Sequence, residues 1–109
     1  MVRASGFRIA LMTCGSAEEA RKIALDLVKK RLAACVNIVT APVESVYRWK
    51  GRVEKAREWL LIIKTSSAQL KNLEQEVRRL HSYETPEFLL IEIGSGSKEY
   101  LAWLKNSLS

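Results

Sequence analysis

The only histidine of the chain lies in a short polar segment, LHSYETPEF, together with two carboxylates. His81 precedes Glu84 and Glu87 by three and six residues. Imidazole and carboxylate groups suit Cu(II), whereas thiolate, thioether and imidazole groups suit Cu(I). Cys14 and Met12 supply the sulfur ligands of that set, although no recognisable metal motif connects them to the segment. These residue types allow a site for copper or another divalent cation, or simply a polar loop between two structured elements.

The same residues offer little support for catalysis. A Cys–His nucleophile pair needs Cys14 beside His81 with a third group to orient the imidazole, and no local signature supports one. Glu84 and Glu87 could perform acid–base chemistry, but paired glutamates in loops are commonly just solvated. The Gly-Ser-Gly tripeptide at 94–96 is too short for a phosphate-binding loop. We therefore do not expect an enzyme.

Length and composition describe one domain covering residues 1–109. The chain is 48% hydrophobic and 28% charged, as is typical of a globular protein. We expect residues 1–6 to be a frayed lead-in. No apolar run approaches the ~20 residues needed to span a bilayer, and no signal peptide is evident, so we expect a cytoplasmic protein with no membrane partner. The two cysteines are then expected to be unpaired.

The hydrophobic pattern places these groups on an α+β chain with the element order β-α-β-β-α-β and a C-terminal helix. Alternating or continuous apolar residues predict strands at 7–13, 35–49, 52–64 and 88–93, and helical periodicity predicts helices at 16–31, 66–81 and from 97 onward. This order is the ferredoxin-like pattern of an antiparallel sheet. The second and third strands form a long hairpin.

Local signals mark the boundaries of these elements. The pairs Ser16–Glu19 and Ser66–Gln69 have the spacing of capping boxes at helix starts. Ser97 is expected to cap the last helix. Pro42 predicts a bend or bulge in the first hairpin strand, because proline cannot donate to the ladder. The dipeptide Lys-Gly at 50–51 predicts the hairpin turn.

Two strands are apolar on both faces, which has a consequence for assembly. The runs WLLII and FLLI lack the polar alternation of a sheet with one solvated face. Two helices cover one face, so something else must cover the second. We expect another copy of the chain, since most oligomers are homo-oligomers. The alternative is that the C-terminal helix provides the cover.

Five sequence blocks then resemble a known family. They are RLAACVN at 31–37, YRWKG at 47–51, LIIKT at 61–65, HSYETPE at 81–87 and YLAWL at 100–104. In this order and spacing they are similar to the CutA divalent-cation tolerance family, over nearly the whole chain. The resemblance implies a ferredoxin-like subunit in a homotrimer, with a role in tolerance of copper and other divalent cations rather than an enzymatic activity.

The resemblance also implies metal ligands. A cysteine late in the first strand, a histidine and a glutamate carry over as Cys14, His81 and Glu87. Met12 stands where the family's cysteine falls, and Cys14 lies two residues later on the same strand face. Ser82 replaces a proline that the family usually has in its histidine segment.

A group of bulky or polar-tipped residues lies at strand and helix ends of this topology. With Glu87 they could line a cleft between subunits: Tyr47, Trp49, Lys64, Tyr83, Glu84 and Trp103. The alternative is that these aromatic side chains only pack a subunit interface, where such residues are enriched. A trimeric regulatory protein that senses a small ligand in such clefts is therefore a second possible function.

An RNA-binding module shares the β-α-β-β-α-β order but is the weaker alternative. The RNA-recognition motif needs stacking aromatic residues on its central strands. The strands RIALMT and WLLIIK lack that platform. The net charge of +6 is scattered rather than clustered. We therefore expect no specific nucleic-acid partner.

Overall fold

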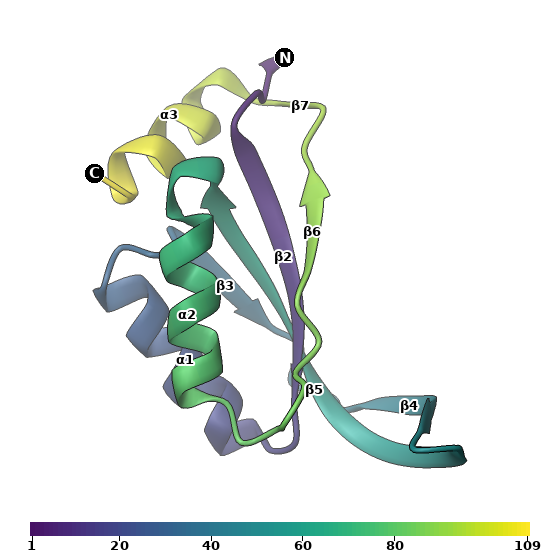
Figure 1. Ribbon diagram of the computed structural model, residues 1–109. Coiled ribbons are helices and arrows are strands. Elements are labelled where there is room, and N and C mark those ends of the chain that lie inside the picture. Colours follow the sequence, from purple (N-terminus) through teal and green to yellow (C-terminus); the bar gives the residue numbers. More distant parts are fainter.

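The computed structural model describes residues 1–109 and places three helices around an antiparallel sheet (Figure 1). The elements in chain order are β1 (Val2–Arg3), β2 (Phe7–Cys14), α1 (Ala17–Lys29), β3 (Cys35–Ile38), β4 (Val43–Trp49), β5 (Arg52–Ser66), a 3₁₀ turn (Ser67–Gln69), α2 (Leu70–Leu80), β6 (Leu89–Glu92), β7 (Ser95–Gly96) and α3 (Lys98–Ser107). None of the helices has both the length and the apolar character needed to cross a bilayer.

The main sheet has the strand order β3-β5-β2-β6, and each neighbouring pair is antiparallel. The first and last long strands therefore lie side by side, and the hairpin strand β5 pairs on the other edge of β2. With α1 and α2 as the connections, this is the ferredoxin-like arrangement. The predicted fold class is confirmed.

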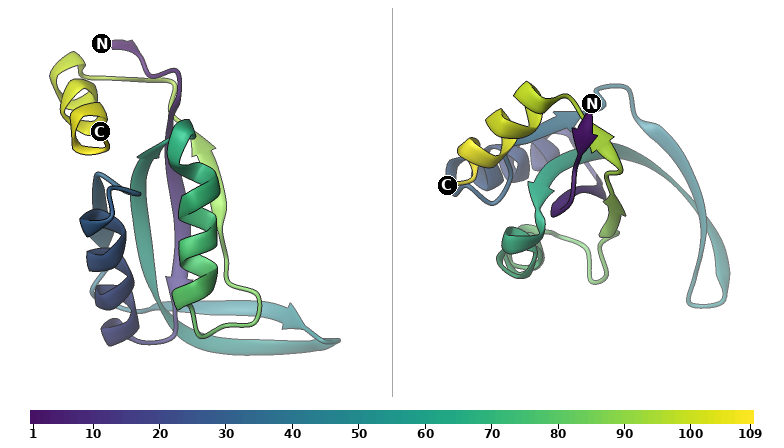
Figure 2. Two further views of the ribbon diagram at one scale, coloured as in Figure 1. Left: turned by 60° about the vertical axis from the view of Figure 1, so that its left-hand side comes forward. Right: turned by 90° about the horizontal axis from the view of Figure 1, so that it is seen from above.

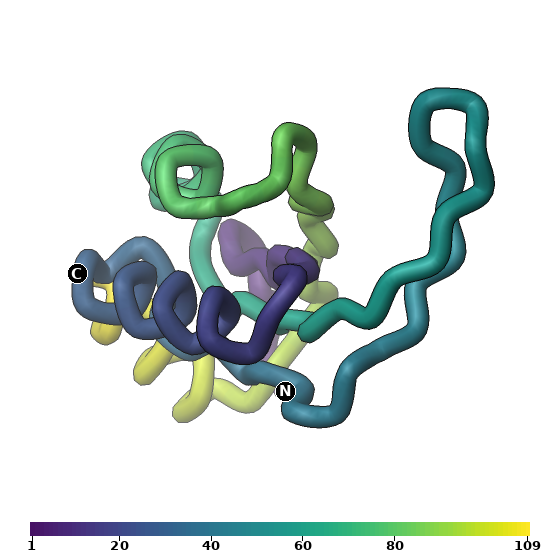
Figure 3. The backbone as a smooth tube through the Cα atoms, turned by 90° about the horizontal axis from the view of Figure 1, so that it is seen from below, coloured from purple at the N-terminus to yellow at the C-terminus, as the bar shows by residue number.

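The long hairpin projects from the body of the subunit, as Figure 3 shows, and the molecule reaches 44 Å along its longest axis. Its turn is confirmed at Lys50 and Gly51, whose φ angles of 50° and 79° fit a two-residue hairpin turn. The first predicted hairpin strand is broken, because β3 ends at Ile38 and β4 begins at Val43. Pro42 lies in this break, where its missing N–H costs no ladder hydrogen bond.

The N-terminal residues are ordered by pairing with the other end of the chain. Val2 and Arg3 form an antiparallel ladder with β7. Ala4 is fully buried and donates its backbone N–H to the carbonyl of Gly94 at 3.2 Å. The prediction of a frayed lead-in at residues 1–6 is therefore wrong, because a partner strand distant in sequence satisfies these backbone groups.

Two of the three predicted helix caps are confirmed. The hydroxyl of Ser16 accepts a hydrogen bond from the backbone N–H of Glu19 at 3.1 Å, and Ser97 caps α3 in the same way. The second capping box is wrong. The Ser66 hydroxyl bonds to the side chain of Gln69 instead, and the chain makes a 3₁₀ turn before α2 begins.

The two faces of the sheet are covered differently. Helices α1 and α2 lie on one side, while the hairpin extends from the other (Figures 2 and 3). The covered face carries the main core, which includes Met12, Leu61 and Ile63. On the opposite face, α3 covers only one end, where Leu104 packs near Phe7. The C-terminal helix therefore accounts for only part of the cover that the sequence requires.

The remaining apolar surface is called the open face. Strand register and period two place its side chains together: Ile9, Leu11, Leu60, Ile62, Leu89 and Ile91. Leu89 and Ile91 are 58% and 45% exposed.

Candidate functional site

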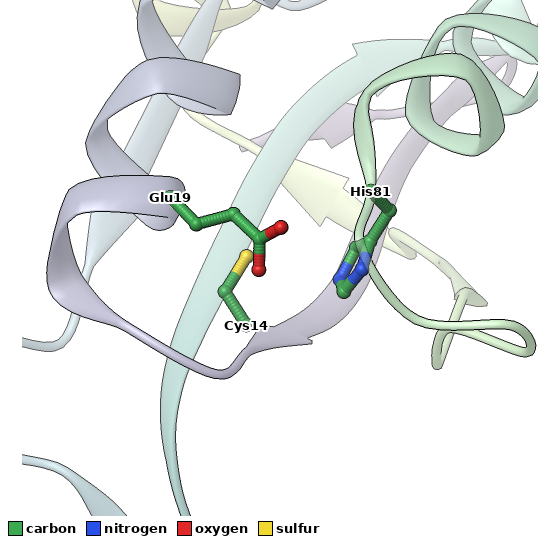
Figure 4. Close-up of side chains that lie close together, drawn as sticks. All are labelled: Cys14, Glu19 and His81. Carbon is green, nitrogen blue, oxygen red and sulfur yellow. The ribbon is translucent and has the colours of Figure 1, made fainter.

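Three side chains from separate elements meet below one end of the sheet, and Figure 4 draws them. Cys14 ends β2, Glu19 lies in the first turn of α1, and His81 follows the last residue of α2. Their thiol, carboxylate and imidazole ligand atoms all lie within 4.8 Å of one another. They are also the only group of three metal-ligating side chains in the chain gathered in this way.

The imidazole of His81 is held by the backbone on both ring nitrogens. The N–H of Tyr83 donates to Nδ1 at 3.0 Å, so Nδ1 carries no proton. Nε2 then bears the hydrogen and donates it to the carbonyl of Thr13 at 2.8 Å. The ring is 8% exposed and lies 4.7 Å from the Tyr83 ring, centroid to centroid. His81 thus ties the end of α2 to the end of β2.

The thiol of Cys14 is fully buried. Burial, and then the nearby carboxylates of Glu19 and Glu58, raise the pKa of this thiol to about 12. The group is therefore protonated at neutral pH and is a poor nucleophile. This argues against the Cys–His pair considered from the sequence.

Glu19 faces the loop after α2 rather than completing its own capping box. Its Oε2 accepts a hydrogen bond from the backbone N–H of Ser82 at 2.9 Å. Burial raises the pKa of the Glu19 carboxyl, but hydrogen bonds from Ser82 and Gly15 outweigh this effect and the pKa is lowered from 4.5. The trio therefore holds one ionised carboxylate and one protonated thiol beside an imidazole whose two ring nitrogens are both hydrogen-bonded.

This donor set fits copper or another borderline divalent cation by ligand type, but the site is not preformed. A metal needs the thiolate of Cys14 and a free lone pair on His81. It must therefore displace the thiol proton and the hydrogen bond that Tyr83 makes to Nδ1. Of the predicted ligands, the structure brings Cys14 and His81 together and adds Glu19, whereas Glu87 lies elsewhere.

Glu87 lines a separate cleft of about 560 Å³ between the hairpin and the loop that follows α2. The lining residues are Thr13, Ser45, Val46, Tyr47, Trp49, Glu58, Tyr83, Glu84, Thr85 and Glu87. The Tyr83 hydroxyl donates to Oε2 of Glu58 at 2.9 Å. Burial, followed by this carboxylate, raises the pKa of Tyr83 above its ordinary value of 10.0. The cleft thus shares Tyr83 with the surroundings of His81.

Four of the six predicted cleft residues line this surface: Tyr47, Trp49, Tyr83 and Glu84. The other two lie apart from it within the subunit. Lys64 donates to the sulfur of Cys35 at 3.6 Å, and Trp103 packs on Tyr100 with a centroid distance of 5.4 Å.

Sequence reasoning missed Glu19 and Glu58. Glu19 was read only as a partner in a helix cap, so its longer-range contact with Ser82 was not considered. Glu58 shares strand parity with Leu60 and Ile62. A lone carboxylate at the end of this apolar row was the signal that could have identified it.

Comparisons with known proteins agree with this architecture. The family model described as CutA1 divalent ion tolerance protein matches residues 8–107. The divalent-cation tolerance protein CutA of Thermus thermophilus is 44% identical over 91% of this chain and 95% of its own length. The chloroplastic protein CutA of Arabidopsis thaliana is 44% identical over 91% of this chain and 54% of its own length. A solved structure from Archaeoglobus fulgidus, described as a periplasmic divalent cation tolerance protein CutA, has a TM-score of 0.91 at 40% identity and covers 94% of this chain and 99% of its own.

Proposed function

This chain belongs to the CutA1 divalent ion tolerance protein family, and from that premise we propose that it serves in tolerance of divalent cations as a metal-responsive protein rather than an enzyme. The single observation that supports a direct role for metal is the meeting of Cys14, Glu19 and His81 within 4.8 Å. Copper is the first candidate, because thiolate, imidazole and carboxylate groups together serve both of its common oxidation states.

The proposed binding reaction exchanges protons and hydrogen bonds for metal ligands. Cys14 loses its proton, and His81 gives up its bond to the Tyr83 N–H. Because the thiol pKa is about 12, affinity should rise roughly tenfold per pH unit across the neutral range. Release of Tyr83 then frees the loop after α2, which gives metal binding a structural consequence outside the trio.

Calorimetric titration with Cu²⁺ tests this proposal, and Co²⁺ provides a second probe because its sulfur-to-metal absorption reports thiolate ligation. We expect Cys14→Ser and His81→Asn to weaken binding at least tenfold, while Cys35→Ser, which removes the other thiol, has no effect. Glu19→Gln and Glu87→Gln distinguish the carboxylate seen beside the thiol from the one implied by the family resemblance. Binding by Cys14→Ser and His81→Asn equal to that of the wild type would contradict the proposal.

We also propose that the protein is a homotrimer assembled through the open face. The apolar side chains of the open face support this proposal, because burial of the exposed half of each by a partner would stabilise the assembly by roughly 1 kcal/mol. Light scattering after size exclusion should give three times the 12.4 kDa of one chain. A monomer at micromolar concentration would contradict this assembly.

A cytoplasmic location is part of the proposal, supported by two free cysteines, as expected in a reducing compartment. Some relatives are described as chloroplastic and one solved structure as periplasmic. Cell fractionation with compartment markers tests the location. The second candidate function, a small-ligand sensor, is favoured by one observation, the cleft that Glu87 lines.

A further inference from the structure

Glu58 is a buried carboxylate that no cationic side chain of the subunit approaches. It is 8% exposed, and the hydroxyl of Tyr83 is the only hydrogen-bond donor to its side chain. The second oxygen, Oε1, accepts no hydrogen bond within the subunit and is not among its buried unpartnered atoms, so it is accessible from the cleft that Glu58 lines. Glu58 takes part in no salt bridge. A carboxylate oxygen that has no partner in the subunit and opens into the 560 Å³ cleft can accept a hydrogen bond from a cation that enters there.

The rest of the lining has the chemistry of a cation site. Two further carboxylates, Glu84 and Glu87, face the same cleft in a chain whose net charge is +6. Trp49 and Tyr47 add aromatic rings, which attract cations through their electron-rich faces. Trp49 is 40% exposed, so its ring is accessible at the rim.

The subunit already shows this pairing once, with its own ammonium group. Nζ of Lys50 lies 5.7 Å from the centre of the Trp49 ring and 4.0 Å from Oε2 of Glu84. Lys50 and Glu84 are both about three-quarters exposed, so their ion pair is weak, and a cation that binds the cleft more tightly can displace Lys50.

A single metal ion does not explain the cleft. The three carboxylates are not among the side chains gathered closely enough to hold one ion together, a property found only for Cys14, Glu19 and His81. Carboxylates dispersed around aromatic rings instead suit an extended molecule. Its ammonium groups would pair with the carboxylates, and its aliphatic body would pack on the rings.

We propose that this cleft binds a small organic cation with primary ammonium groups, one of which pairs with Glu58 while the aliphatic chain lies against Trp49. Glu58 is the anchoring residue, because its unpartnered oxygen can accept a charge-assisted hydrogen bond in a buried setting. Glu84 and Glu87 take the second ammonium group near the rim. The inference rests on the second candidate function, the small-ligand sensor, and is independent of the metal site at Cys14.

The test is titration of the full-length protein with 1,4-diaminobutane at low salt and in the presence of a metal chelator. Binding is measured by calorimetry and by tryptophan fluorescence. We expect saturable binding, and no binding of the isosteric 1,4-butanediol or of succinate. Glu58→Gln keeps an acceptor for the Tyr83 hydroxyl and should weaken binding between about tenfold and a hundredfold, the range for hydrogen bonds to charged groups. Glu92→Gln removes an equal charge outside the cleft from an 85% exposed side chain and should bind like the wild type.

Two more variants keep the test decisive if Glu58→Gln folds poorly. Lys50→Ala removes the competing ammonium and should strengthen binding about twofold or more, whereas Trp49→Phe should abolish most of the fluorescence change. Absence of diamine binding to the wild type would overturn the proposal, including the case in which a partner subunit fills the cleft. Equal affinity of Glu58→Gln and the wild type would also overturn it. Neither result bears on Cu²⁺ binding at Cys14, which is measured without chelator.

Discussion

At the scale of single residues, His81 has a structural role that competes with metal binding. Its ring joins the carbonyl of Thr13 to the N–H of Tyr83, so both nitrogens are already satisfied inside the protein. Cys14 is similarly protected, because its thiol is buried and protonated. A metal must overcome both effects, so we expect metal affinity to be set by proton release more than by ligand position.

The first prediction concerns the different reactivity of the two thiols. At pH 7.5, iodoacetamide should modify Cys14 at least tenfold more slowly in the native protein than in protein unfolded in urea, because the reagent needs an exposed thiolate. Cys35 is only partly buried and should react first. Peptide mass spectrometry gives both rates. Equal modification of the two cysteines in the native state would show that Cys14 is neither shielded nor protonated as described.

At the scale of elements, α1 and α2 are joined by a cluster of charges. Glu76 of α2 accepts two hydrogen bonds from Arg79, at 2.9 and 2.8 Å, and one at 2.6 Å from Lys30, the C-cap residue of α1. Arg79, then Asp26 and Lys30, lower the pKa of Glu76 far below 4.5. Burial, then Glu76, raises the pKa of Asp26 from 3.8, and its Oδ2 has no partner. The two carboxyls therefore respond to acid in opposite directions.

This gives a second prediction, which compares Glu76→Gln with Asp26→Asn. A carboxyl whose pKa is lower in the folded than in the unfolded protein stabilises the fold above its unfolded pKa, and this stabilisation is lost as the pH falls. The free energy of unfolding of the wild type should therefore fall by about 1 kcal/mol, through Glu76, below pH 4.5. Glu76→Gln should lack that part of the acid sensitivity and be less stable at pH 7. Asp26→Asn should not be less stable at pH 7, because a raised pKa contributes stability only at low pH. Urea unfolding between pH 3 and pH 7 measures both, and equal loss in the two variants would contradict the assignment.

The same scale separates what could be predicted from the sequence from what could not. Helix faces, the hairpin turn and two caps follow from short-range patterns, so they were predictable. The ladder between β1 and β7 joins the two ends of the chain and has no local signal. Ser66 has the spacing of a cap, yet its hydroxyl bonds to a side chain, a choice that spacing alone does not determine.

The candidate site was predictable to a similar extent. Cys14 and His81 are rare, chemically distinctive residues, so their types drew notice before their proximity was known. Glu19 and Glu58 belong to a common residue type, and their importance comes from burial and long-range contacts. Only the fold supplies those facts.

At the scale of the whole molecule, only one face of the sheet is fully covered within the subunit. The main core fills the face under α1 and α2, and α3 covers one end of the other. What remains is the open face, whose six apolar side chains come from three adjacent strands. The hairpin projects from the body of the subunit (Figure 3) and exposes apolar side chains, among them Val46 and Val53, as a second surface. Both features favour association of several copies over a monomer.

The last prediction places a charge on this open face. Ile91→Glu puts a carboxylate where Ile91 is 45% exposed in the subunit, so the folded monomer should tolerate it. If a partner buries that position, the buried charge should dissociate the proposed trimer, and light scattering should report the mass of one chain. Leu25→Glu is the matched control, because Leu25 is 57% exposed on α1, away from the open face, and its mass should stay at three chains. An unchanged mass for Ile91→Glu, with circular dichroism confirming that it is folded, would exclude the open face as the interface and leave the projecting hairpin as the surface to test next.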